Sequence, residues 1–250
     1  LSPAILWTLR RHGVRIVMTL HDYKLISPNY NLLVRGQIWD HTSGWRAIVD
    51  RAVQDSSVKS AVCAVEQWVH RLIGSFGKVD AFIAPSRFLI DKFHSVGFPY
   101  PITHVVQPIC PFPAAPTQAS GEYLLYIGRL SGEKGGATLI NAATLLSNEI
   151  ALKIIGTGPE ESILREQARG VSGIEFLGYQ TGDAWEVALA GAKALVVPSI
   201  WYENMPYVVL EALSRGKPVI ATRIGGMPER IEDGVNGWLF EAGDVEGLVR

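Results

Sequence analysis

The stretch ALVVPSIWYENMPYVVLEALSRGKPVIAT, residues 194–222, contains the alternation that predicts the fold of this chain. The runs at 194–197 and 218–221 are short, continuous and apolar, as expected of strands buried on both faces. Between them, Pro206 suits the first turn of a helix and Gly216 suits its end. A strand, a helix and a second strand in this order predict a parallel sheet covered by helices.

The rest of the chain continues this alternation of apolar runs and helical periodicity. Further strands are predicted at residues 14–20, 80–85, 102–106, 123–127, 152–155 and 175–177. Helices are predicted at residues 45–73, 86–97, 136–147, 159–169, 183–192, 206–215 and 227–232. The predicted fold class is therefore α/β, with two Rossmann-like doubly wound domains and a cleft between them.

Residues 107–121 separate the two domains, because they contain four prolines and little periodicity. Proline ends helices and cannot donate a hydrogen bond within a central strand. The predicted division is a partial N-terminal domain at 1–112, a linker at 113–121 and an incomplete C-terminal domain at 122–250. Open α/β sheets bind ligands at the carboxyl ends of their strands, so the residues after each strand are the candidates for a site.

Composition limits the class of protein. The 250 residues are 48% apolar, which is enough to bury a globular core. The sequence has no apolar run of the roughly 18 residues that a membrane-spanning helix needs. The net charge of −1 does not indicate the excess of basic side chains that is typical of nucleic-acid-binding proteins.

Charge is unevenly distributed between the two halves. Residues 1–112 carry 12 lysines and arginines against 7 acidic residues, whereas residues 113–250 carry 11 against 17. A basic half can rest on an anionic membrane surface. We therefore predict that the first half contacts the cytoplasmic membrane face, near a lipid-linked acceptor; an asymmetry that arose by chance is the alternative. The basic side chains of the helix predicted at 45–73 include Arg46, Arg51, Lys59 and Arg71.

The two cysteines, Cys63 and Cys110, have neither metal-binding nor redox spacing. We expect two buried apolar side chains in a reducing compartment, which favours a cytoplasmic protein. Leu1 is not a methionine and Arg250 lies in a predicted helix, so we expect a sequence cut at both ends.

The segment GRLSGEKGG, residues 128–136, follows the predicted strand at 123–127. Its glycines, Gly128 among them, let the backbone turn tightly beside a ligand. Arg129 and Lys134 add two cations, and the helix predicted next adds its positive N-terminus. These features predict a diphosphate cradle with a solvated Lys134, and an ordinary basic turn is the alternative. The segment is not a Walker A loop, because a glutamate stands where that pattern needs glycine.

Two shorter signals also follow strands. GTGPE, residues 156–160, presents Gly156 to a ligand, or forms only a turn in which Pro159 starts a helix. It lacks the GxGxxG pattern, because residue 161 is glutamate. His21 follows the strand at 14–20, where it either faces a ligand or has a structural role.

Glu203 and Glu211 flank the start of the helix predicted at 206–215. They are eight residues apart, a little over two helical turns, so we expect both to face one elongated ligand from the same side. A carboxylate can accept two sugar hydroxyls at once, which suits a ribose or hexose better than a metal ion. A solvated helix position is the alternative for Glu211, although its neighbours are apolar.

Together these segments resemble glycosyltransferase family 4, the retaining group with the GT-B fold. The resemblance rests on GRL-x-x-EKG at 128–135, G-x-GP-E at 156–160, FLG at 176–178 and PSIWYENMPYVVLEALSRGKPVIA at 198–221. The patterns GG-x-x-E at 225–229 and DG-x-NG-x-LF at 233–240 follow, and T-x-HD at 19–22 extends the resemblance into the first half.

The resemblance implies a role for each candidate residue. Arg129 and Lys134 would hold the donor diphosphate. Glu203 would contact the transferred sugar, Glu211 the ribose, and His21 the sugar from the other domain. The other donor-binding positions that it implies are Gly128, Gly156 and the backbone of Asn204, Met205 and Pro206.

The resemblance also implies a reaction. A sugar would pass from a nucleotide-diphosphate sugar to a glycan or lipid-linked acceptor, with retention and without a metal or a cofactor. The N-terminal domain would lie on the acceptor side and the C-terminal domain would bind the donor. A sugar-nucleotide epimerase or a phosphorylase of the same architecture, or a nucleotide-sugar-binding protein without activity, are the alternatives.

The sequence departs from the family pattern in three places. The first strand and its Gly-rich loop would precede Leu1, and the closing helices would follow Arg250. Gln107-Pro108 stands where relatives often have Asn-Gly.

Overall fold

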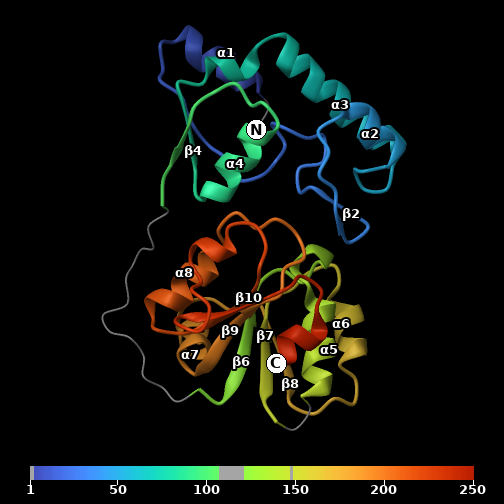
Figure 1. The fold of residues 1–250 in the computed structure, drawn as a ribbon, viewed down its shortest axis with the longest axis vertical. Coiled ribbons are helices and arrows are strands. Elements are labelled where there is room, and N and C mark those ends of the chain that lie inside the picture. Colours follow the sequence, from blue (N-terminus) through green and yellow to red (C-terminus); the bar gives the residue numbers. More distant parts are fainter. Residues whose placement is uncertain (1–2, 107–120, 147–148) are drawn as a thin grey trace. The chain divides into compact units, whose positions relative to one another are not determined.

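The computed structural model describes residues 3–106, 121–146 and 149–250 (Figure 1). The chain divides into two compact units, Leu1–Gln107 and Pro108–Arg250. The linker predicted at 113–121 lies outside the described residues except for Gly121. The predicted domain boundaries therefore stay predictions.

The first unit contains a parallel sheet with the strand order β1-β4-β5. Its strands are β1 Val17–Thr19, β4 Ala81–Ala84 and β5 Ile102–His104, and β2 Leu33–Val34 pairs with β3 Gln37–Ile38. Its helices are α1 Ala4–Arg11, α2 Gly44–Val49, α3 Ser57–Leu72, η1 Ser75–Lys78 and α4 Arg87–Ser95. The three predicted strands are confirmed. The predicted burial of 14–20 is wrong at Val14 and Val17, which are 43% and 62% exposed; Val17 lines a pocket and is not packed under any helix of the described residues.

The single helix predicted at 45–73 is wrong, because the structure has two helices there, α2 and α3. Between them, Gln54 and Asp55 have φ angles of 51° and 50°, in the left-handed region that is incompatible with a continuous helix. Ser56 then starts α3, because its side chain accepts a hydrogen bond from the backbone N–H of Lys59. Apolar periodicity continues through the break and therefore does not reveal it.

The second unit contains a six-stranded parallel sheet in the order β11-β10-β9-β6-β7-β8. The strands are β6 Tyr123–Ile127, β7 Ala151–Ile155, β8 Ile174–Gly178, β9 Ala192–Val197, β10 Val219–Thr222 and β11 Gly237–Phe240. The five strands predicted in this half are confirmed, and β11 is an addition to them. The chain order reverses between β6 and β9, so their carboxyl ends form the switch point where such sheets bind ligands.

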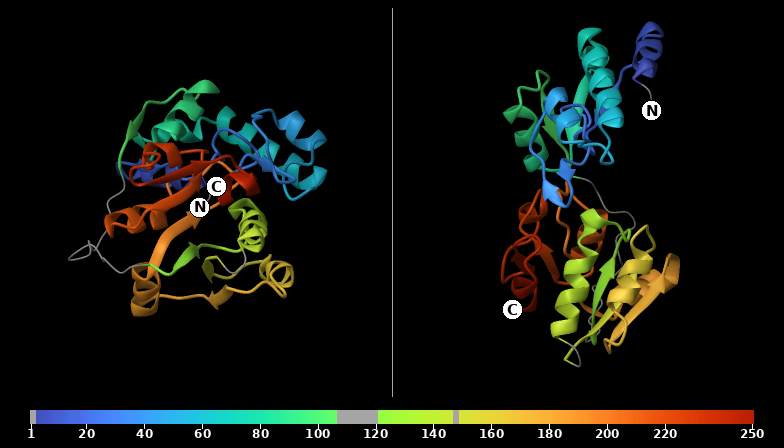
Figure 2. Two further views of the ribbon diagram at one scale, coloured as in Figure 1. Left: turned by 60° about the horizontal axis from the view of Figure 1, so that its bottom comes forward. Right: turned by 90° about the vertical axis from the view of Figure 1, so that its right-hand side faces the viewer.

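Helices cover both faces of this sheet (Figure 2). On one face, α7 Gly182–Ala190 and α8 Tyr207–Ser214 pack against Leu125, Leu195 and Val219. On the other face, α5 Gly136–Leu145, α6 Glu161–Gln167 and α9 Val245–Val249 pack against the alternate strand residues, such as Tyr126 and Ile154. The prediction of a parallel sheet buried on both faces is confirmed.

Two predicted helices of the second unit differ in the structure. The helix predicted at 227–232 is a short 3-10 turn, η3 Met227–Glu229. The Asn236 side chain ends it, because it donates to the Arg230 carbonyl and accepts from the backbone N–H of Glu232. The helix predicted at 159–169 begins at Glu161, so Pro159 lies in the preceding turn. The backbone N–H of Glu160 is held by the Leu130 carbonyl at 3.0 Å, which keeps that turn out of the helix.

Candidate functional site

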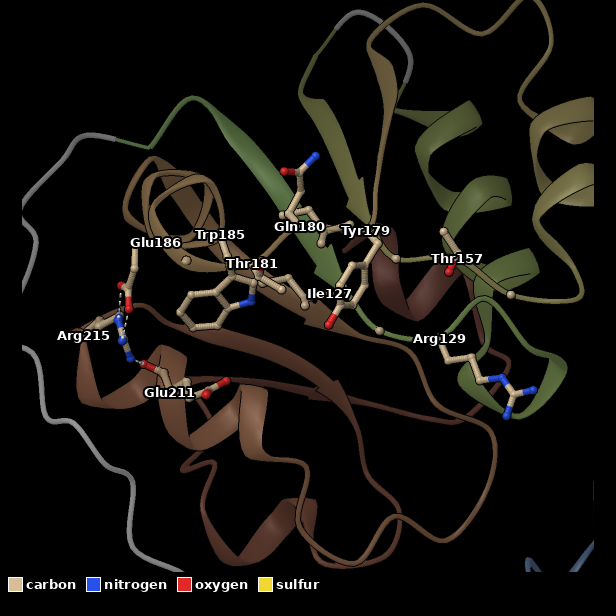
Figure 3. Close-up of a pocket in the computed structure, with 15 residues that line it drawn as sticks. Ile127, Arg129, Thr157, Tyr179, Gln180, Thr181, Trp185, Glu186, Glu211 and Arg215 are labelled. Atoms are coloured by element: carbon tan, nitrogen blue, oxygen red, sulfur yellow. Dashed lines mark hydrogen bonds and ion pairs between the residues drawn. The ribbon is translucent and has the colours of Figure 1, made fainter.

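A pocket of about 780 Å³ lies in the second unit at the carboxyl ends of three strands (Figure 3). Gly128 follows β6, Gly156 follows β7 and Tyr179 follows β8, and all three line the pocket. Trp185 of α7 and Glu211 of α8 line another side of it. Its size and its place at the switch point are those of a small-molecule site.

Gly156 brings two of these strand ends into contact. Its φ angle is +138°, and a Cβ at this position would lie 1.8 Å from the Gly128 carbonyl oxygen. The backbone N–H of Gly128 donates to Ile155 O at 3.0 Å, and that of Leu130 donates to Thr157 O at 3.0 Å. Only glycine fits this approach, so Gly156 shapes the floor of the pocket.

Tyr126 supports the turn that carries Arg129. Its buried hydroxyl donates to the Arg129 carbonyl at 2.9 Å. Burial, with a smaller contribution from the Glu203 carboxylate, holds the pKa of Tyr126 far above its ordinary value, so the hydroxyl remains a donor. Arg129 is exposed at the pocket, and Figure 3 shows its guanidinium extending away from Glu211.

Lys134, on the turn after β6, and Glu203, on the loop after β9, form an ion pair. Lys134 Nζ lies 2.6 Å from Glu203 Oε1, and the Ser199 hydroxyl donates to the same oxygen at 2.7 Å. The side chain of Glu203 is 6% exposed and that of Lys134 is 26% exposed. The prediction that Lys134 is solvated is therefore wrong, because its ammonium group pairs with a carboxylate from a loop that is distant in the sequence.

Backbone contacts hold the two loops of this ion pair together. The turn η2 Gly132–Lys134 ends at Gly135, whose φ angle is +72°. A Cβ at Gly135 would lie 1.8 Å from the Pro198 carbonyl oxygen, and the backbone N–H of Ile200 donates to Glu133 O at 2.9 Å. The Gly-rich turn after β6 is thus joined to the loop after β9, and α5 begins directly behind it.

The predicted site residues fall into separate groups. Gly128, Arg129, Gly156 and Glu211 line the pocket, and the Lys134–Glu203 pair is not part of its lining. Glu203 therefore faces Lys134 and Ser199, whereas Glu211 faces the pocket. The remaining predicted residues of this loop are Asn204 and Met205, both buried, and Pro206, which is the N-cap of α8.

The environment of Glu211 favours a carboxyl that holds its proton more tightly than usual. Burial raises its pKa above the ordinary value, the nearby Arg215 opposes this, and the nearby Glu186 adds to it. Glu186 and Arg215 line the same pocket. A ligand that binds here meets two carboxylates and one guanidinium along one wall.

His21 lies in the first unit, where it lines a second pocket of about 550 Å³. Its side chain is exposed, and most of that lining is apolar, including Leu6, Met18 and Phe76. Cys63 also lines this pocket and is half-buried, so its predicted burial is only partial. Cys110 lies outside the described residues.

Sequence reasoning missed one wall of the main pocket. The residues of this wall follow β8, belong to α7 or lie at the end of α8. They are Tyr179, Gln180, Thr181, Trp185, Glu186 and Arg215. The rule that residues after a strand line the site would have found the first three, because they follow the predicted strand at 175–177. Nothing local marks Glu186 and Arg215, because their partners come from other elements.

Comparisons with known proteins agree with this geometry. A family model described as glycosyl transferases group 1 matches residues 121–250. Sulfoquinovosyl transferase SQD2 of Arabidopsis thaliana is 36% identical over 129 residues, which are 50% of this chain and 25% of that protein. An uncharacterized 42.6 kDa protein in the cps region of Klebsiella pneumoniae is 28% identical over 236 residues, which are 92% of this chain and 56% of that protein.

A solved structure extends the likeness over both units. HepE of Anabaena, crystallised in complex with UDP and glucose, matches with a TM-score of 0.71 at 20% identity, over 99% of this chain and 64% of that one. This likeness shows the fold, which is the predicted GT-B fold. The chain spans less than two thirds of each of these three proteins, from 25% to 64% of their lengths.

Proposed function

This chain belongs to the glycosyl transferases group 1 family, and we propose that the whole protein transfers a sugar from a nucleotide-diphosphate sugar to a glycan or lipid-linked acceptor. The observation that carries this proposal is the switch-point pocket with Glu211 in its wall and Arg129 at the turn after β6. A cation, a close backbone turn and a carboxylate suit the diphosphate and the ribose of one donor.

We propose that the donor lies with its nucleoside in the main pocket. Glu211 then accepts hydrogen bonds from the ribose hydroxyls, because an ionised carboxylate has room for two donors. Arg129 and the N-terminus of α5 hold the diphosphate. Gly128 and Gly156 are proposed to lie along the diphosphate, where the ends of β6 and β7 approach each other closely.

Lys134 and Glu203 are proposed to work at the departing bond. Negative charge develops on the diphosphate as the sugar leaves, and Lys134 is a nearby cation that can share its ammonium between Glu203 and that oxygen. Glu203 already accepts from Lys134 and Ser199, so its proposed role is to position the transferred sugar rather than to attack it. The backbone of Asn204, Met205 and Pro206 completes the sugar pocket, and His21 of the first unit contacts the sugar.

The finer features of the reaction belong to the same proposal. Transfer is proposed to retain the configuration of the sugar and to need neither a metal ion nor a cofactor, since side-chain cations and a helix N-terminus supply the positive charge. The alternatives are an epimerase or phosphorylase of the same architecture and a binding protein without activity.

Product analysis with radiolabelled nucleotide sugars separates these alternatives. Screening UDP-, GDP- and ADP-sugars for thermal stabilisation of the whole protein selects the donor. Label that moves onto an acceptor supports the transferase. Isomerised donor would point to an epimerase, release of sugar phosphate in the presence of inorganic phosphate to a phosphorylase, and binding without turnover to a binding protein.

We also propose that the first unit rests on an anionic membrane at the cytoplasmic face. None of the helices in the described parts of the chain is long and apolar enough to cross a membrane. α3, however, exposes an apolar face made of Val58, Val62, Val65, Val69 and Leu72. These residues follow one another at intervals of four and three, so they lie along one side of the helix.

The charge of the unit complements such a surface. α3 buries polar residues instead, Ser60 and Gln67, so its apolar face is turned outward. Lys59 is exposed near one edge of this face, and Trp68 is exposed near the other. Residues 1–112 carry 12 basic side chains against 7 acidic ones. An apolar face with basic and tryptophan side chains is typical of helices that lie in the membrane interface.

A further inference from the structure

Arg215 joins α7 to the carbonyl end of α8. It is the C-cap of α8, and its side chain is only 7% exposed. Its Nε and Nη2 donate to both carboxylate oxygens of Glu186 on α7, at 2.9 and 2.7 Å. Its Nη1 donates to the backbone carbonyl of Glu211 at 3.0 Å, as Figure 3 shows. These hydrogen bonds, with a longer one from Nη1 to the Ser214 hydroxyl at 3.5 Å, hold the guanidinium in one orientation.

The indole of Trp185 supports the same guanidinium. The centre of the Arg215 guanidinium lies 5.1 Å from the centroid of the Trp185 ring, a cation–π contact. Trp185, Glu186, Glu211 and Arg215 all line the main pocket. Glu186 and Trp185 of α7 thus support, through Arg215, the pocket wall to which Glu211 belongs.

This arrangement also controls charge. Glu186 and Glu211 are two carboxylates that line one pocket, and like charges at short range disfavour ionisation of both. Arg215 pairs with Glu186 in a bidentate contact, which offsets part of the repulsion that the Glu186 carboxylate exerts on Glu211. Lysine could not reproduce this contact, because it lacks the planar fork.

We infer that Arg215, paired with Glu186, is a positioning residue that keeps the Glu211 carboxylate aimed and ionised for the ribose diol of the donor. This inference rests on the proposed function. The preference of the site for ribonucleotides would then depend on Arg215 and Glu186, which do not themselves contact the ribose. A purely structural role, in which Arg215 only ties α7 to α8, is the competing explanation.

Paired nucleotides distinguish the two roles. UDP, GDP and ADP are each compared with the 2′,3′-dideoxy analogue by calorimetric titration of the whole protein, and the ratio of the two affinities is the readout. The dideoxy analogue cannot donate hydrogen bonds to an ionised Glu211, so we expect the wild-type protein to bind the ribonucleotide ~10–100 times more tightly than the analogue. Arg215→Met should reduce that ratio to within ~3-fold of unity, while affinity for the dideoxy analogue changes by less than ~3-fold.

A second variant and a matched control complete the design. Arg215→Met combined with Glu186→Gln should recover part of the ratio, because the unpaired charge of Glu186 is then gone. Arg165→Met is the control, since Arg165 also pairs with a carboxylate, Glu161, and lies over an aromatic ring, Phe176, but lines no part of the main pocket. It should keep the wild-type ratio.

Some outcomes overturn only the role inferred for Arg215, and another overturns the proposed function as well. A wild-type ratio in Arg215→Met, or an equal loss of affinity for both members of a nucleotide pair, overturns the inference alone. If Arg215→Met does not fold, Arg215→Lys decides: an unchanged ratio overturns the inference and a reduced one supports it. Failure of the wild-type protein to bind any of the three nucleotides overturns the proposed function and the inference with it.

Discussion

Lys134 Nζ lies 2.6 Å from Glu203 Oε1, so the cation predicted for the diphosphate and the carboxylate predicted for the sugar are partners in one ion pair. Neither residue can be substituted without changing the surroundings of the other. We therefore expect a single substitution at either position to affect both the proposed transfer and the folding stability.

Lys134→Ala should slow sugar transfer by ~10²–10³-fold, the usual cost of removing one charge-stabilising group. It should also lower the free energy of unfolding by about 1–3 kcal/mol, because it leaves the buried Glu203 carboxylate without its cation. Urea denaturation of the variant and of Lys134→Ala combined with Glu203→Gln measures the second effect. The double variant should regain part of the stability; a Lys134→Ala protein as active and as stable as wild type contradicts both roles.

Glu211→Ala should weaken the binding of both the donor and the nucleoside diphosphate, because the ribose is common to the two ligands. Glu203→Ala should not weaken the affinity for nucleoside diphosphate, because its proposed partner is the sugar and Lys134, released from the ion pair, stays available to the diphosphate. Calorimetric titration of each variant with both ligands gives this pattern. Equal losses of nucleoside-diphosphate affinity in the two variants would show that the division of roles is wrong.

Glu211 should make the ligand-free protein less stable at neutral pH than a Glu211→Gln variant. Burial raises the folded-state pKa of Glu211, so the folded protein binds its proton more tightly than the unfolded chain does. This contribution stabilises the fold below the ordinary pKa of 4.5 and is lost as pH rises through the raised value. Urea denaturation from pH 4 to pH 8 should show the gap between variant and wild type widening with pH. A gap that is constant over this range would argue against a raised pKa.

Gly156→Ala should destabilise the second unit by more than ~3 kcal/mol, beyond the usual range for one substitution. Its Cβ would lie 1.8 Å from the Gly128 carbonyl oxygen, so the two strand ends would have to separate. Gly234→Ala is the matched control, because Gly234 also has a positive φ, +78°, but a Cβ there meets nothing within 4 Å. Gly234→Ala should lower the free energy of unfolding by only about 1–2 kcal/mol. Similar losses in the two variants, measured by thermal unfolding, would exclude the close approach as the cause.

Replacing Val62 and Val69 of α3 by serine should weaken binding to anionic vesicles by roughly tenfold, because both side chains belong to its exposed apolar face. Vesicle co-sedimentation at low and high salt measures this, with Val187→Ser of α7, another exposed valine, as the control. Equal binding of the wild-type protein to neutral and anionic vesicles at low salt would rule out the electrostatic part of the proposal.

Local sequence determined the secondary structure of the second unit well. The strand at Tyr123–Ile127 and the helix start at Gly136 were both predictable, because continuous apolar runs and a glycine-rich turn reflect constraints that act within a few residues. The place of Gly156 in the lining of the main pocket was predictable for a related reason. In a parallel sheet every strand ends on the same edge, so position after a strand already implies position in the site.

The contacts between elements were decided only by the tertiary structure. Lys134 and Glu203 are 69 residues apart, and Arg215 and Glu186 are 29 apart. Strand order and loop packing bring these charges together, and neither leaves a periodic trace in the sequence. The break between α2 and α3 was hidden for the same reason, since apolar spacing continues across it while left-handed residues and the Ser56 cap end one helix and start the next. Periodicity records which residues are buried along one element, whereas an ion pair depends on where two elements meet.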